Sequence, residues 1–173
     1  MMSDTTHRWA TAVHEAAHGV AAIVLGGECS QLSVHHDGGG LAFLDGLSPF
    51  DHAIVTAAPT AAAEILADVS PPEIEPTTES FDVRPSICDL TPREKLEFAA
   101  KFSAGVPTDE QSIAAFCIAG LADQPLRWSE RFYGVHHIAD QVVSDHQTAI
   151  LAVARELFAR GTLSKSEITE LLK

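Results

Sequence analysis

Two histidines and a glutamate near the start of the chain have the types and spacing of a hydrolytic zinc site. His14, Glu15 and His18 form an HExxH pattern, with the two histidines four positions apart. On a helix, residues four apart lie one turn apart on the same face, so both imidazoles can bind one zinc ion. Glu15 can face the same cleft and take a proton from a water that zinc has made more acidic. The pattern therefore predicts a zinc hydrolase with Glu15 as its general base.

The setting of this pattern argues against chance. Nine histidines and 13 glutamates in 173 residues would give roughly 0.03 matches to HExxH by chance. The pattern also lies inside a segment, from about Thr5 to Leu25, that is predicted to be a helix ending near Gly26. Apolar residues recur there at three- and four-residue steps and form one stripe: Ala10, Val13, Ala17, Val20 and Val24.

A third zinc ligand must come from elsewhere, because catalytic zinc takes three protein ligands and leaves the fourth position to water. The metzincin class is excluded, since it needs a glycine and a histidine where Ala21 and Val24 stand. The residues alone leave these candidates open: Glu64, Asp82, Asp89, His35 and His36.

The segments after this first helix predict a small hairpin and a second helix. Residues 29–34 and 41–44 are predicted strands on either side of a glycine-rich turn. Residues 51–69 are alanine-rich and helical in character, and Pro59 is expected to kink this helix or split it in two. Residues 70–90 hold four of the nine prolines and are predicted to be a long loop.

Later helices are marked by capping boxes, in which a hydroxyl and a side chain three residues on bond the free amides of a helix start. The boxes pair Thr91 with Glu94, Thr108 with Gln111, and Ser164 with Glu167. A long helix is predicted from about Val135 to Arg160, closed by Gly161. The whole chain, 1–173, is therefore predicted to be one mainly α domain with a small β-hairpin.

Composition and charge exclude several classes of partner. Lys and Arg total 11 against 24 Asp and Glu, and the formal net charge of -13 repels nucleic acid and anionic membranes. The apolar run from Gly19 to Leu25 is too short to span a bilayer, and the N-terminus lacks the charged start of a signal peptide. The three cysteines have no CxxC spacing, which favours buried thiols in a reducing compartment. We expect a cytoplasmic protein without nucleic-acid or membrane partners.

The predicted zinc helix also resembles a known family. Residues 11–27, TAVHEAAHGVAAIVLGG, look like the zinc helix of the peptidase domain in the FtsH family of ATP-dependent membrane metalloproteases, which carries an HEAGH core. Residues 32–44 occupy the place of that family's strand, glycine turn and edge strand, and residues 154–173 are similar to its closing helices. The resemblance implies an FtsH-peptidase-like, zincin-type helical domain that hydrolyses peptide bonds.

The resemblance also implies a third ligand. In that family the ligand is an aspartate in a Gly-Ala-x-x-Asp-Leu motif, well beyond the second histidine and just before a helix. Asp89 and Leu90 match the Asp-Leu pair, 71 residues beyond His18, although the Gly-Ala is absent. Asp89 is therefore the predicted ligand. Glu64 is the main rival, and is otherwise expected to orient a zinc histidine.

The function that follows is a zinc-dependent metalloendopeptidase. The family's membrane segments and ATPase domain are missing from this sequence, so we expect its substrates to be peptides or unfolded protein segments, unless a separate unfoldase assists. The family's ring assembly implies a homo-oligomer. The alternative is a non-catalytic metal-binding or interaction module that keeps the peptidase scaffold, and a hydrolase of non-peptide bonds is a third reading. Glu15 favours the enzyme, because a structural zinc site needs no base.

Overall fold

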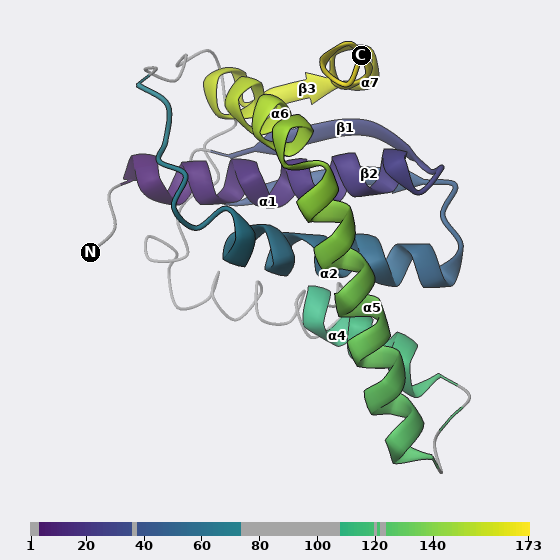
Figure 1. Cartoon of the computed structure of the whole chain (residues 1–173). Coiled ribbons are helices and arrows are strands. Elements are labelled where there is room, and N and C mark those ends of the chain that lie inside the picture. Colours follow the sequence, from purple (N-terminus) through teal and green to yellow (C-terminus); the bar gives the residue numbers. More distant parts are fainter. Residues whose placement is uncertain (1–3, 36–37, 74–107, 120, 122–123) are drawn as a thin grey trace, which may run out of the picture.

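The computed structural model describes residues 4–35, 38–73, 108–119, 121 and 124–173 of the chain. These residues form helices and a small sheet (Figure 1). In chain order the elements are α1 (Asp4–Val24), β1 (Glu28–Val34), β2 (Gly40–Asp45), α2 (Pro49–Ile65), α4 (Asp109–Ile118), α5 (Pro125–Asp145), α6 (Gln147–Arg160), β3 (Thr162–Ser164) and α7 (Lys165–Leu171). The prediction of a mainly helical fold with a small sheet is confirmed.

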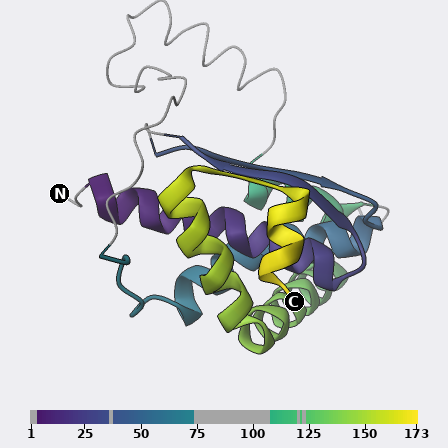
Figure 2. The ribbon, with the colours of Figure 1, turned by 90° about the horizontal axis from the view of Figure 1, so that it is seen from above.

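The sheet has the strand order β2-β1-β3, and both pairs of strands are antiparallel. The strands run along one side of the molecule and the helices lie on the other (Figure 2). The predicted hairpin between β1 and β2 is confirmed. The third strand was not predicted, because the three residues of β3 are too few to show an alternating pattern. With β3 on the far side of β1, strand β2 lies at the edge of the sheet among the described residues.

Helix α1 lies at the centre of the fold, because small apolar side chains let its neighbours approach closely. It packs against α2, α6, β1 and β2, and α1 and α2 lie side by side (Figure 1). Six of its residues are fully buried: Ala12, Ala16, Ala17, Val20, Ala21 and Ala22. Leu32 of β1 and Phe158 of α6 belong to the same core cluster. The helix that carries the HExxH pattern is therefore fixed on several sides.

The predicted helix 51–69 is one helix that continues through Pro59, and it ends at Ile65 rather than at residue 69. It begins after Ser48, whose hydroxyl accepts a hydrogen bond from the amide of Asp51. A proline ring at N1 or N2 suits this start, because the first amides of a helix have no intrahelical partner.

The prediction of one long helix over 135–160 is wrong. The chain forms α5 and α6 instead, with a break at His146, and helical structure already begins at Pro125. Helix α5 packs mainly on α2 whereas α6 packs on α1, so the chain changes direction between them (Figure 1). The end at Gly161 is confirmed, since this glycine has a φ of 76° in the left-handed region.

The predictions of capping boxes and buried cysteines can be checked where they fall on described residues. The capping boxes of Thr108 with Gln111 and of Ser164 with Glu167 are confirmed, whereas the box at Thr91 lies outside the described residues. Cys29 and Cys117 are buried free thiols. Within the described ranges, the helices are all too short or too polar to cross a membrane.

Candidate active site

The two histidines of the HExxH pattern lie on one face of α1, as the sequence predicts. The rings of His14 and His18 are 4.9 Å apart between centroids. The His14 side chain is 44% exposed, while that of His18 is only 11% exposed. The pair therefore spans the boundary between the interior and the surface, where a bound ion would reach both protein ligands and solvent.

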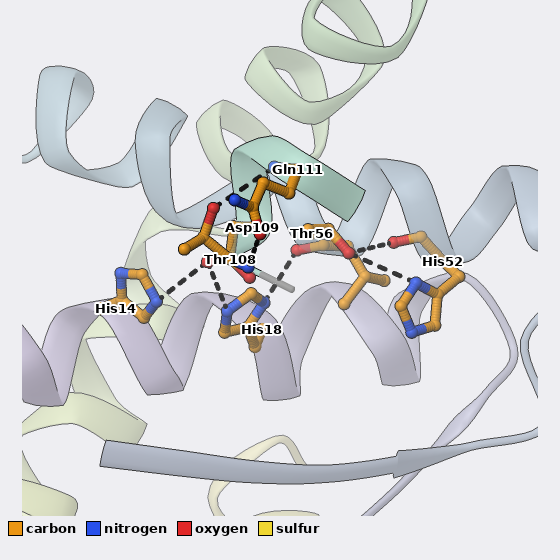
Figure 3. A network of polar contacts seen from close by, with 8 residues as sticks. His14, His18, His52, Thr56, Thr108, Asp109 and Gln111 are labelled. Atoms are coloured by element: carbon orange, nitrogen blue, oxygen red, sulfur yellow. Dashed lines mark hydrogen bonds and ion pairs between the residues drawn. The ribbon is translucent and has the colours of Figure 1, made fainter. Parts of the chain in front are cut away.

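Asp109, the first residue of α4, joins both imidazoles. Its Oδ2 atom lies 3.3 Å from Nε2 of His14 and 3.4 Å from Nε2 of His18, and Figure 3 shows its carboxylate between the two rings. The capping box of Thr108 and Gln111 fixes the start of α4 at this point. Helix N-termini favour negative charge, so the carboxylate is well placed at that position.

The electrostatics of Asp109 keep it ionised. Partial burial raises the pKa of its carboxyl, but hydrogen bonds and charges from His14 and His18 outweigh burial and hold the pKa well below the ordinary value. One ligand atom from each of the three side chains lies within 4.8 Å of the others. Two imidazoles and an ionised carboxylate are a donor set that suits a transition-metal ion, so these residues fit a metal.

The orientation of His18 is set by helix α2. Its Nδ1 atom lies 2.9 Å from the carbonyl oxygen of Val55. Because a carbonyl can only accept a hydrogen bond, Nδ1 must carry the proton of this contact. The other nitrogen, Nε2, is then the atom turned towards Asp109. Such a bond to the far nitrogen fixes the orientation of a ligand histidine.

Glu15 is buried beside the histidine pair and is 6% exposed. Burial raises the pKa of its carboxyl, and the charges of His18 and His14 oppose this only in part. Strand β2 begins against the same side chain, since a Cβ atom added at Gly40 would lie 2.5 Å from Oε1 of Glu15. The glycine at this position therefore leaves the room that the carboxylate occupies.

The glycine turn before β2 is docked on α1. The hydroxyl of Thr11 on α1 donates to the carbonyl of Gly38 at 2.7 Å. Within the turn itself, the amide of His35 donates to the carbonyl of Gly39 at 2.7 Å. Gly38 has a φ of 84°, a backbone angle that residues other than glycine rarely adopt. Thr11 and Glu15 are four residues apart on α1, so the turn and the start of β2 cover consecutive turns of one helix face.

A cavity of about 790 Å³ opens beside this face. Its walls come from the first half of α1, the glycine turn and the end of α2, and they include Trp9, Glu15, Gly40 and Leu66. The indole N–H of Trp9 donates to the carbonyl of Val69 at 3.0 Å, which holds the segment after α2 against α1. Glu15 therefore lies in the wall of an open cavity.

The predicted third ligands have different outcomes. Asp89, Asp82 and His36 lie outside the described residues, so the prediction of Asp89 stays a prediction. Glu64 is exposed on α2. Within the described ranges, neither Glu64 nor His35 belongs to a group of side chains that could hold a metal ion.

Asp109 was missed by the sequence analysis, although the sequence carries signals for it. Gly105 stands four positions before Asp109, the same spacing as in the Gly-Ala-x-x-Asp motif, and the capping box at Thr108 marks a helix start. The Asp-Leu pair at Asp89 matched the end of that motif and drew the prediction to an earlier position.

Residues 4–66 match the model of a family described as Peptidase M50B-like. This segment contains α1, the hairpin and α2, and with them His14, Glu15 and His18. The match indicates a metallopeptidase family, but not the FtsH family in particular. No curated protein matches the chain. The metallopeptidase class is therefore supported by the same segment that carries the histidine pair.

Proposed function

We propose that this chain is a zinc-dependent metalloendopeptidase that cleaves peptides or unfolded protein segments. The observation that carries the proposal is the meeting of His14, His18 and Asp109 beside the buried Glu15. The family match of residues 4–66 supports a metallopeptidase independently of this geometry.

In this proposal the ion is held by Nε2 of both histidines and by the carboxylate of Asp109. Three protein ligands of this type are usual for catalytic zinc and leave a fourth position open. When bound, zinc would lower the pKa of a water molecule and polarise the carbonyl of the peptide bond. The hydrogen bond from His18 to Val55 holds one imidazole with its Nε2 turned towards Asp109.

Glu15 is the proposed general base and acid. Its carboxylate takes a proton as the water oxygen bonds to the peptide carbonyl carbon, and it gives that proton to the amide nitrogen as the C–N bond breaks. A carboxyl whose pKa is raised by burial suits both steps, because it accepts and releases a proton more evenly near neutral pH.

The shape of the site supports the proposed substrate class. The cavity beside Glu15 lies at the surface between α1, the glycine turn and α2, so an extended segment can enter it. A folded protein would first have to release such a segment, which is why we propose peptides or unfolded chains, with a separate unfoldase for folded substrates.

The test compares wild type with Glu15→Gln on an unfolded protein such as casein. The glutamine cannot accept a proton, so hydrolysis should fall by about 100- to 10,000-fold. Zinc content, measured on the same samples, should be equal because Glu15 is not a ligand. Equal hydrolysis by both would assign the activity to another site or to a contaminant. If zinc-loaded wild type cleaves no member of a broad peptide library, the interaction module becomes the better account.

A further inference from the structure

Pro59 lies inside α2, four residues after the carbonyl that accepts a hydrogen bond from His18. In an α-helix the amide of residue 59 would donate to the carbonyl of Val55. Proline has no amide hydrogen, and its ring also crowds the carbonyl four residues earlier. Helix α2 therefore offers no hydrogen from residue 59 to the atom that His18 contacts.

We propose that Pro59 is a positioning residue for the metal site. Because it leaves the Val55 carbonyl without its usual helical donor, that oxygen is available to Nδ1 of His18, and the bond turns Nε2 towards Asp109. This inference rests on the proposed function, since it concerns how a ligand of the proposed zinc site is held.

The hydrogen bond between His18 and Val55 lies in a buried part of the protein. Val55 is 1% exposed and His18 is 8% exposed, and Pro59 is buried as well. Water therefore competes poorly for either atom, and a buried N–H left without an acceptor is unfavourable. Helix α2 thus supplies the carbonyl of Val55 as an acceptor, which the amide of residue 59 would occupy in a regular helix. The buried His18 of α1 uses this acceptor.

The experiment replaces Pro59 by Ala, which returns an amide hydrogen to position 59. That hydrogen competes with His18 for the Val55 carbonyl, so zinc affinity in a chelator competition should fall by about 10- to 100-fold. The Nδ1–H proton of His18, followed by NMR with and without zinc, should exchange with solvent faster than in wild type. A merely structural role of Pro59 would not move this proton.

The matched control is Pro49→Ala at the start of the same helix. An amide hydrogen there has no intrahelical acceptor to take, so zinc affinity and the exchange of the His18 proton should stay at the wild-type level. Circular dichroism checks that both variants are folded.

A second variant separates the missing hydrogen from the proline ring. Lactic acid at position 59, introduced as an ester linkage, lacks both the amide hydrogen and the ring, and it should keep wild-type zinc affinity. It also decides the matter if Pro59→Ala does not fold. The proposal is overturned if Pro59→Ala keeps both the affinity and the slow exchange, or if the ester variant loses them. Failure of wild type to bind zinc would instead contradict the proposed function, while the exchange of the metal-free protein still tests Pro59.

Discussion

Gly40 lies so close to Glu15 that a Cβ atom added at the glycine would meet Oε1 of the glutamate at 2.5 Å. Gly40→Ala should therefore push the carboxylate out of its place. Forcing a methyl group into such a packed position costs about 1–3 kcal/mol, and we expect this loss in the free energy of unfolding measured in urea. We also expect weaker hydrolysis with unchanged zinc content.

The same change in a Glu15→Ala background isolates the contact. With the carboxylate gone, Gly40→Ala should cost much less stability, so the two mutations should be strongly non-additive. Gly134→Ala serves as the control, because a Cβ atom there meets nothing within 4 Å and alanine favours the helix. Additive losses would mean that Gly40 matters for another reason.

Asp109→Ala should weaken zinc binding markedly, because it removes the one carboxylate that the described structure places against both histidines. Its effect is measured by equilibrium dialysis against a chelator. Glu64→Ala, at an exposed position of α2, should leave binding unchanged. If Asp89→Ala strips the metal and Asp109→Ala does not, the ligand predicted from the family resemblance is the right one.

The sequence was sufficient for the parts of the site that depend on local spacing. The helical face of His14 and His18 follows from a four-residue interval, and the hairpin follows from two short strands around glycines. The end of α6 at Gly161 and the two described capping boxes were also predicted from local signals. Each of these predictions uses residues only a few positions apart, and such residues meet whatever the rest of the chain does.

The position of Asp109, the proposed third ligand, does not follow from local spacing. Asp109 is 91 residues beyond His18, and it reaches α1 because α4 packs against α2 and α5. The bond between His18 and Val55 likewise depends on how two helices meet. The break at His146 was missed because the helical pattern continues across it, although the two halves pack on different neighbours.

The thiol of Cys29 should resist alkylation in the folded protein. It is 1% exposed, and burial raises its pKa to about 11, so little of the reactive thiolate forms at pH about 8. Mass spectrometry after iodoacetamide treatment should find Cys29 unmodified in native protein and modified in urea. Rapid labelling without urea would show that this part of the core opens readily.

The capping box of α7 should make a contribution to the stability of the protein that depends on pH. Hydrogen bonds from the Ser164 hydroxyl and amide, together with Arg160, lower the pKa of Glu167 to about 2. An exposed glutamate has a pKa of about 4.3, so the contribution is complete above that value and is lost as pH falls towards 2. The difference in Tm between wild type and Glu167→Ala should therefore shrink between about pH 5 and pH 2. A difference independent of pH would show that the charge of Glu167 is not involved.

A crystal structure of the zinc-loaded protein, with anomalous data collected at the zinc absorption edge, tests the central claim most directly. We predict one zinc ion per chain, bound by Nε2 of His14, Nε2 of His18 and a carboxylate oxygen of Asp109 at about 2.0–2.2 Å. Glu15 should lie near the ion without binding it, and the fourth position should hold water. An ion bound elsewhere, or a fourth protein ligand that closes the site, would contradict the account of this chain as a zinc peptidase.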